Sequence, residues 1–516
     1  MNSVYNATDL PLKEEYDYIV VGGGTAGCPL AATLSKRYSV LVLERGSAPT
    51  TYPDHVLIAN GLFTSLLAED DGKTPAQRFV SEDGVDNVRG RVLGGSSMIN
   101  GGFYSRANHK FYKESGVDWD MKLVDKAYRW VENTVVYVSN LSNWQANFKE
   151  AFLEAGVGPD NGFNLNHVVG TKISASSFDD QGRRHGSVEL LNRGKLNNLK
   201  VAVEAYVQKI IFSSKASRLS ASGVIYNDSK GKIHKAFVRD KGEVILSAGA
   251  IGSPQLLLLS GVGPASYLSS LKIPVVHQNS YVGKYLADNP RNNINLVFPF
   301  ILEPSSLQVV AITNESNYIE SISYDLQFSF PKPFALYSKS TSPINFSIAT
   351  IVEKFLGPLS KGSLKLVSSK DVRISPKVRF NYFANPEDLT RCVRGMRKVG
   401  DILKTKPMDK FKFHDWEGDK DFRYLGPSLP KNYKSDNASM EKFCRSTVTT
   451  FWHYHGGCVV GKVVDGKFRV IGINSLRVVD GSIFNSSPGT NPQGSLMMMG
   501  RYVGLRILQE RRAGMK

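Results

Sequence analysis

A short stretch near the C-terminal end, residues 451–457, holds the side chains best suited to acid–base chemistry. It is aromatic and histidine-rich, unlike any other part of the chain. A neutral imidazole can take the proton of a hydroxyl group at neutral pH, so His453 is a candidate base, whereas His455 is expected to be structural. The remaining histidines lie in polar surroundings without evident partners and are expected to have no catalytic role: His55, His109, His167, His185, His234, His277 and His414.

A second motif, near the start of the chain, indicates nucleotide binding. The β-branched run Tyr18–Val21 ends in the G-x-G-x-x-G sequence Gly22–Gly27 and leads into a helix-forming segment, which predicts strand, tight turn and helix. The helix N-terminus would present free N–H groups to phosphates, and Glu44, about 20 residues further on, is placed to meet a ribose hydroxyl. The motif predicts a dinucleotide site, the alternative being an ordinary glycine-rich turn, and it leaves FAD and NAD equally open.

Two further blocks of small residues indicate that backbone lies close to a ligand. The block 90–104 is rich in glycine and serine and includes Asn100, whose amide can hydrogen-bond to a flat ligand. The block 249–263 follows a predicted strand and is expected to form a turn, a buried helix that starts at Pro254 and a glycine stop. The polar stretch 47–87 is too long for a simple connection and is expected to form a lid or a wrap over the nucleotide.

Length and charge limit the class of protein. The 516 residues allow roughly two to four domains of about 150 residues each. The net charge is +17, but the basic residues are scattered and form no run typical of nucleic-acid binding. No apolar run approaches the roughly 20 residues of a membrane span. We therefore expect a soluble protein that binds neither nucleic acid nor a membrane.

Cysteine and asparagine usage bears on the compartment. The 4 cysteines are too few for a disulfide scaffold and form no C-x-x-C metal motif. Glycosylation sequons, which hint at secretion, occur at Asn6, Asn140, Asn227, Asn314, Asn345, Asn437 and Asn485. No signal peptide precedes the first predicted strand. We expect a secreted or vacuolar protein whose leader has been removed, with a cytoplasmic protein as the alternative.

Hydrophobic periodicity outlines the remaining elements. Residues 119–156 have helical spacing, and a helix with one buried face is expected from Leu389 to Leu403. Strands are expected at Val201–Ile211, Gly223–Tyr226, His234–Val238 and Glu243–Leu246. Between residues 292 and 382, short runs alternate apolar and polar residues, which predicts an antiparallel sheet inserted into the nucleotide fold. These runs are Ile294–Phe300, Val309–Thr313, Asp325–Phe330, Ile344–Ile351 and Leu364–Val367.

In their order along the chain, these blocks resemble the glucose-methanol-choline (GMC) oxidoreductase family over nearly the whole length. Within it the sequence is most similar to the plant branch that holds the mandelonitrile (hydroxynitrile) lyases, in the passages 87–100, 116–121 and 452–457. The resemblance implies an α/β fold with FAD as cofactor: a Rossmann-like FAD-binding domain with a parallel sheet (residues 1–115, 196–290 and 440–516), and an α+β substrate-binding domain built on an antiparallel sheet (116–195 and 291–439). We expect a monomer that acts on a small-molecule alcohol or cyanohydrin.

The resemblance also implies individual contacts to FAD. The phosphates are expected to meet Gly22, Gly24, Thr25 and Ala26, the ribose Glu44 and Arg45, and the adenine the backbone of Val207. Gly27 belongs to the same cofactor-binding turn and is expected to let the helix pack close to the strand. Around the isoalloxazine ring we expect Val92, Ser96, Asn100, Gly101, Gly102, Phe103, Phe451, Trp452, Asp480, Gly481, Gln493 and Gly494. A disulfide between Cys392 and Cys444 is implied, and no metal is expected.

The catalytic residues that the resemblance implies are His453, as base, and Asn491. Family members carry His or Asn at the second position; both can hydrogen-bond a substrate oxygen, but only His can also act as a base. The mandelonitrile lyases carry His there, a tyrosine where Phe451 stands, and a cysteine that has no match between residues 300 and 330.

Because function resides in the site, these departures favour FAD-dependent oxidation of a primary or aryl alcohol, with His453 as base and hydride transfer to flavin N5. The alternative is an (R)-hydroxynitrile lyase that makes or cleaves cyanohydrins with a non-redox FAD. A catalytically silent flavoprotein used for binding is a third hypothesis.

Overall fold

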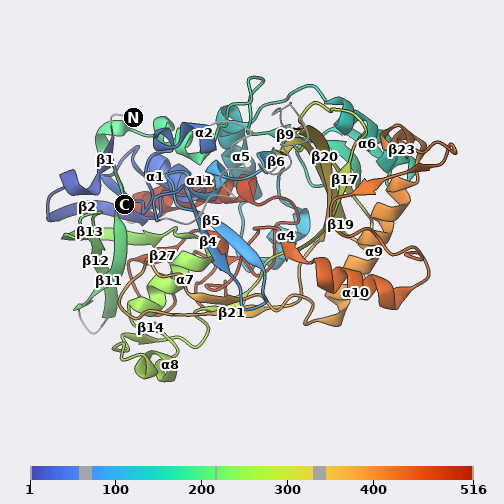
Figure 1. Cartoon of the computed structure of the whole chain (residues 1–516). Coiled ribbons are helices and arrows are strands. Elements are labelled where there is room, and N and C mark those ends of the chain that lie inside the picture. The colour runs from blue at the N-terminus through green and yellow to red at the C-terminus, as the bar shows by residue number, and fades with distance from the viewer. Residues whose placement is uncertain (1–2, 57–71, 216–217, 329–343, 514–516) are drawn as a thin grey trace, which may run out of the picture.

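The computed structural model of the chain describes residues 3–56, 72–215, 218–328 and 344–513. Two large sheets dominate the fold, one on the left and one on the right of Figure 1, and each carries a hydrophobic core of its own. The first is mainly parallel and the second mainly antiparallel, which confirms the predicted fold class. The domain boundaries given above stay a prediction.

The first sheet contains the nucleotide motif. Its strands run in the order β1 (Val4–Asn6), β10 (Leu199–Val203), β3 (Val40–Leu43), β2 (Lys13–Val21), β13 (Ile233–Leu246), β12 (Arg218–Asn227) and β11 (Tyr206–Lys215), and β27 (Leu476–Val478) also pairs with β13. Pairing is parallel from β1 to β13 and antiparallel from β13 to β11. Strand β3 and the second half of β2 are buried along their length, as expected at the centre of a parallel sheet.

The turn after β2 depends on glycine. Gly22 has a φ of +102°, and a Cβ atom there would collide with the carbonyl group of Ser247 at the end of β13. A Cβ atom on Gly27 would collide with the carbonyl oxygen of Gly22. Only glycine at these two positions therefore lets β2 end beside β13 and lets helix α1 (Gly27–Leu34) begin after a tight turn. Helix α11 (Gln493–Ala513) packs against α1 and against α5 (Met121–Val135).

Three elements of this half differ from the sequence prediction. The strand expected at 201–211 is two strands, because Glu204 between them takes a φ of +56°. The two strands expected at 234–246 are one, since β13 continues through a register shift between Val238 and Glu243. Helix α7 (Gly249–Leu259) starts before Pro254, because the Asp480 carboxylate accepts the N–H of Gly249, at 2.9 Å, and so holds the first turn.

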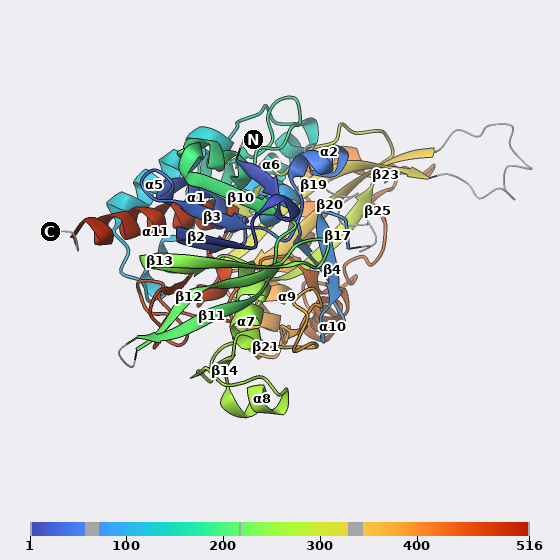
Figure 2. The ribbon, with the colours of Figure 1, turned by 90° about the vertical axis from the view of Figure 1, so that its left-hand side faces the viewer.

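The second sheet has the order β25 (Arg423–Tyr424), β17 (Pro290–Val297), β20 (Ile344–Phe355), β19 (Asn317–Phe328), β18 (Val309–Ile312), β8 (Gly170–Ile173) and β7 (Asp160–Phe163), and β26 (Thr449–Thr450) also pairs with β17. Helices α6 (Asn143–Glu154) and α9 (Pro386–Leu403) pack on this sheet. The predicted disulfide is present and joins Cys392 of α9 to Cys444 of α10 (Asn437–Thr447). Figure 2 shows the β19–β20 hairpin extending away from the first sheet.

One predicted strand of this half lies in another sheet, and two predicted segments are only partly described. The run expected at Leu364–Val367 belongs to β21 (Gly362–Lys365), which pairs with β16 and β22 in a separate small sheet. Residues 329–330 of another predicted strand, and residues 57–71 of the predicted wrap over the nucleotide, lie outside the described residues.

The remaining helices and strands are short: α2 (Pro53–Val56), β4 (Ala76–Val80), β5 (Asp86–Gly90), β6 (Phe103–Tyr104), α4 (His109–Glu114), β9 (Ala175–Ser176), β14 (Val262–Gly263), α8 (Ala265–Ser270), β15 (His277–Gln278), β16 (Lys284–Leu286), β22 (Lys377–Arg379), β23 (Phe413–His414) and β24 (Lys420–Asp421). Within the described ranges, no helix is both long and apolar enough to cross a membrane.

Candidate active site

A cavity of about 1260 Å³ is lined by residues of both halves of the molecule. Its wall includes the β2–α1 turn, the 90–104 block, the start of α7, strands β17 and β19, and the segments 449–454 and 491–496. A pocket for a drug-sized ligand is typically about 300–1,000 Å³. The cavity is therefore large enough for an extended dinucleotide together with a small substrate.

Most residues predicted to contact FAD line this one cavity. They are Gly22, Gly24, Thr25, Ala26, Glu44, Arg45, Ser96, Asn100, Gly101, Gly102, Phe103, Val207, Phe451, Trp452, Asp480, Gly481 and Gln493. Gly27, Val92 and Gly494 do not line it; the two glycines lie against backbone instead, Gly27 against Gly22 and Gly494 against Ser105. The individual contacts to FAD stay predictions, but the set of residues that forms the wall fits that cofactor.

The geometry of Glu44 suits a ribose. The side chain is 5% exposed; its Oε2 atom accepts the N–H of Gly23 at 3.0 Å and its Oε1 atom the N–H of Gly46 at 2.8 Å. Burial raises the pKa of Glu44, and these hydrogen bonds together with Arg45 oppose the rise. Each oxygen keeps capacity to accept a further hydroxyl. The carboxylate is thus fixed in place before a nucleotide arrives.

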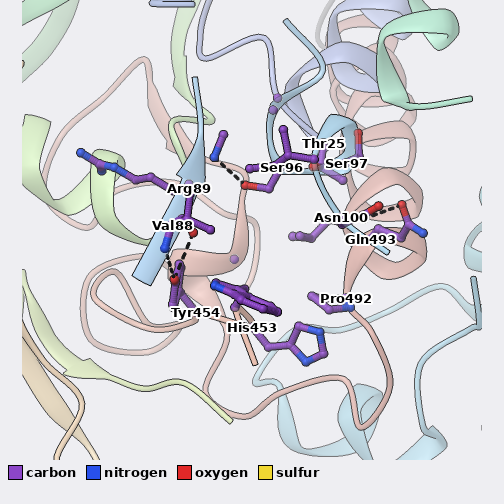
Figure 3. A pocket seen from close by; sticks show the side chains of 18 of the residues that line it. Thr25, Val88, Arg89, Ser96, Ser97, Asn100, His453, Tyr454, Pro492 and Gln493 are labelled. Carbon is purple, nitrogen blue, oxygen red and sulfur yellow. Dashed lines mark hydrogen bonds between the residues drawn. The ribbon is translucent and has the colours of Figure 1, made fainter. Parts of the chain in front are cut away.

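Two amide side chains brace the cavity wall near the C-terminal helix. Asn100 donates to Gln493 Oε1 at 3.0 Å (Figure 3). Gln493 Nε2 donates to the carbonyl oxygen of Phe103 at 2.7 Å. On the same wall, Ser96 accepts the N–H of Gly90 at 3.1 Å. The two bonds of Gln493 hold the 90–104 block against α11, although the two segments are far apart in sequence.

His453 follows a strained turn. Trp452 takes a φ of +58°, a left-handed conformation that costs roughly 1–3 kcal/mol in a non-glycine residue. The turn is held because Trp452 N–H donates to Thr450 Oγ1 at 2.8 Å and His453 N–H donates to Asp288 Oδ1 at 2.8 Å. The His453 ring lines the cavity, 4.4 Å from the Phe451 ring between centroids.

The electrostatics of the site keep His453 neutral. Its side chain is buried, and burial lowers its pKa well below the ordinary range, with further lowering from the positive charges of Lys354 and Arg291. A neutral imidazole retains one nitrogen that can accept a proton. His455 is buried behind it, with Nδ1 3.0 Å from the His453 carbonyl oxygen, and does not line the cavity.

Asn491 lines the same cavity as His453. Its Oδ1 atom accepts the hydroxyl of Tyr318 at 2.9 Å, which fixes the amide, and its NH₂ group, which has two hydrogens to donate, also hydrogen-bonds to Glu320 and lowers the pKa of that carboxyl group. Figure 3 shows His453 beside Pro492, the neighbour of Asn491. The two predicted catalytic residues are therefore brought to one wall; their roles stay predictions.

Sequence reasoning missed the charged residues around this pair. Glu320 of β19 and Arg291 of β17 line the cavity, and Lys354 of β20 lies behind His453. In an alternating strand, polar residues are expected to face solvent. Here that face is covered, so Glu320 and Lys354 are buried instead. The adjacent pair Glu353–Lys354 within an apolar run was the available signal, because such a run offers little reason for two charges.

The other histidines include partners that sequence did not reveal. His234 is fully buried, with Nε2 3.2 Å from Asp228 Oδ2, and His185 Nδ1 lies 3.0 Å from Glu189 Oε2. The prediction that they have no partner is wrong for these two. Neither lines the cavity, and no cluster suited to a metal occurs in the part of the chain that the structure describes.

Comparison with known proteins agrees with this geometry. Models of the GMC oxidoreductase family match residues 16–291 and 358–500. The chain is 57% identical over 510 residues to (R)-mandelonitrile lyase 1 of Prunus serotina (99% of this chain, 90% of that protein). It is 52% identical to the sinalpyl alcohol oxidase Nec3 of Nesocodon mauritianus (98% and 91%). A crystal structure of formate oxidase superposes with a TM-score of 0.80 at 20% identity (98% and 100%), which shows the fold alone.

Proposed function

Because the chain belongs to the GMC oxidoreductase family, we propose that it is an FAD-dependent enzyme that oxidises a primary or aryl alcohol. The observation that carries this proposal is the pairing, on one cavity wall, of a neutral imidazole with a fixed amide. Bound FAD supplies the acceptor for the hydride that leaves the alcohol carbon. The protein's own task is then to take a proton and to hold an oxygen.

His453 takes the proton of the alcohol, and Asn491 holds the oxygen. With Nδ1 of His453 directed to Lys354, Nε2 is the nitrogen left for the substrate. The NH₂ group of Asn491 donates to the oxygen as it loses its proton, which stabilises the developing negative charge. Asp288 and the turn at Trp452 hold the backbone of His453, so that its imidazole stays on the same cavity wall as the Asn491 amide.

A hydroxynitrile lyase is the second candidate. It is favoured by the identity of more than half of the aligned residues with a mandelonitrile lyase and by Arg291, which lines the cavity and whose positive charge would stabilise a departing cyanide ion. Against it stands Asn491, since an amide cannot serve as a base. The two candidates differ in whether the flavin changes its redox state.

That difference defines the experiment. The holoenzyme is mixed without oxygen with a panel of benzyl-type and long-chain primary alcohols, and separately with mandelonitrile, while the visible flavin absorbance and released cyanide are followed. We expect an alcohol to bleach the flavin. Cyanide release from mandelonitrile, with no alcohol bleaching the flavin, would replace the oxidase by the lyase.

We further propose that the protein is a monomer of an oxidising compartment, either extracellular or vacuolar. The buried disulfide between α9 and α10 supports the compartment, because such bonds persist where thiols are not kept reduced. Fractionation of the source tissue tests the location, and light scattering of the purified protein tests the oligomeric state.

A further inference from the structure

Lys354 is a buried lysine that contacts the candidate base. It lies on β20, is 1% exposed, and its Nζ atom is 3.3 Å from His453 Nδ1. Nζ also lies 4.5 Å from the centroid of the Tyr318 ring and 4.8 Å from that of Phe451. It does not line the cavity, so it reaches His453 from behind the wall.

The charge of Lys354 decides which nitrogen of His453 carries a proton. An ammonium group has three donors and no acceptor, so it requires Nδ1 as an acceptor. The neutral ring then carries its hydrogen on Nε2 and offers the substrate a donor. An uncharged amine has a lone pair and can accept a hydrogen from Nδ1, which leaves Nε2 free to take a proton.

We propose that Lys354 is a positioning residue that sets the tautomer of His453, and that His453 acts as a base only while Lys354 is an uncharged amine. The proposal rests on the proposed function, in which His453 takes the proton of the alcohol. The bond between the alcohol oxygen and its hydrogen breaks as the Nε2–H bond forms, and the Nδ1 hydrogen moves to Nζ. The net result is that the alcohol loses one proton, Lys354 gains one and becomes an ammonium group, and the imidazole stays neutral with its hydrogen on Nε2.

The surroundings of Lys354 allow both charge states near neutral pH. Burial lowers its pKa to about 7, and the carboxylates of Glu320, Asp288 and Glu353 oppose the fall. Burial raises the pKa of those carboxyl groups to about 7, 6 and 8, respectively, so none is a fixed negative charge. Other charged or titratable groups around this cluster include Arg291, His167, His455, Tyr318 and Tyr382, whereas Lys361 acts on His455 and not on Lys354.

Glu320 tunes this balance. It is 3% exposed and lines the cavity; hydrogen bonds from Asn491 and Tyr318 lower the pKa of its carboxyl group, while its Oε2 atom has no hydrogen-bond partner among the described residues. Its negative charge favours the ammonium form of Lys354. Replacement by glutamine keeps the shape and removes that charge. Lys354 then loses its proton at a lower pH, and His453 becomes a base at a lower pH.

The test observes the tautomer directly. Holoenzyme with histidine labelled with ¹⁵N on both ring nitrogens is titrated without substrate, and the His453 signals are assigned by comparison with His453→Gln. We expect the hydrogen to move from Nε2 to Nδ1 as the pH rises, with a midpoint between pH 5.5 and 9, because burial lowers the pKa of Lys354. Lys354→Arg should hold it on Nε2 throughout, because guanidinium stays charged. Glu320→Gln should lower the midpoint.

A matched control is Lys361→Met, which removes another buried lysine whose pKa is lowered to about 8 but which donates to the Asn485 carbonyl oxygen, at 3.2 Å, and not to His453. It should leave the midpoint unchanged. The proposal is overturned if wild-type His453 keeps one tautomer from pH 5.5 to 9, or if the midpoint of the tautomer change is the same in Glu320→Gln as in the wild type.

The two proposals can fail separately. If the tautomer changes but no alcohol reduces the flavin, the proposed function fails and the role of Lys354 stands. If an alcohol reduces the flavin while the tautomer stays fixed, only the role of Lys354 fails. When both hold, the rate of flavin reduction should rise with pH over the same range as the tautomer change.

Discussion

Asn491→Ala tests whether the amide holds the oxygen of the alcohol. The variant removes the NH₂ donor at the point where negative charge develops. Loss of one such donor costs about 10²–10³ in rate, or about 2.7–4 kcal/mol. The substitution also removes the acceptor of the Tyr318 hydroxyl, whose residue is 1% exposed, and an unmet buried hydroxyl costs about 1–3 kcal/mol in stability. The stability loss should lie at the low end, because Glu320 neighbours that hydroxyl and can accept its hydrogen.

The two effects are separated with Tyr318→Phe, which removes the same hydrogen bond but keeps the amide and the ring beneath Lys354. Anaerobic stopped-flow measurement of flavin reduction gives the rate, and thermal unfolding gives the stability. We expect Asn491→Ala to be slow and slightly destabilised, and Tyr318→Phe to be much closer to wild type in rate. An Asn491→Ala variant that reduces its flavin at the wild-type rate would refute the assignment of the amide to the substrate oxygen.

The remaining predictions concern the base, the divergence from the lyases and the disulfide. His453→Ala should slow flavin reduction by about 10²–10⁴ with an unchanged ratio of FAD to protein; an unaffected rate would remove His453 from the mechanism. Asn491→His should release cyanide from mandelonitrile faster than the wild type, because a second imidazole can act as a base; no gain would mean that this position does not separate the two activities. Cys392→Ser/Cys444→Ser should lower the stability by about 4 kcal/mol, the loop-entropy cost of a separation of 52 residues, and an unchanged Tm would contradict this.

The sequence predicted best those features that one short segment determines. The turn at Gly22 follows from a strand, a glycine spacing and a helix that are contiguous, and its stereochemistry admits only glycine. Most of the predicted strands of the antiparallel sheet appear for the same reason, since alternation is a local pattern, but the strand at Leu364–Val367 pairs in a separate small sheet. The disulfide came from family resemblance, because its two cysteines lie on different helices.

What the sequence could not predict depends on contacts between distant segments. Helix α7 starts early because Asp480, more than two hundred residues away, accepts the N–H of Gly249. Glu320 and Lys354 lie outside the predicted strand segments, and in the structure the cavity wall and the 451–453 segment cover both side chains. The charge environment of His453 follows from that covering, so only the folded chain reveals it.

The most direct test of the proposed oxidation compares benzyl alcohol with the same alcohol deuterated at its reacting carbon. The two substrates are mixed with holoenzyme without oxygen, and the rate of flavin bleaching is measured with wild type and with His453→Ala. Oxidation by hydride transfer predicts that the deuterated alcohol bleaches the flavin more slowly and that the variant bleaches it far more slowly with either substrate. If the holoenzyme releases cyanide from mandelonitrile while neither alcohol bleaches its flavin, the proposed oxidation is contradicted.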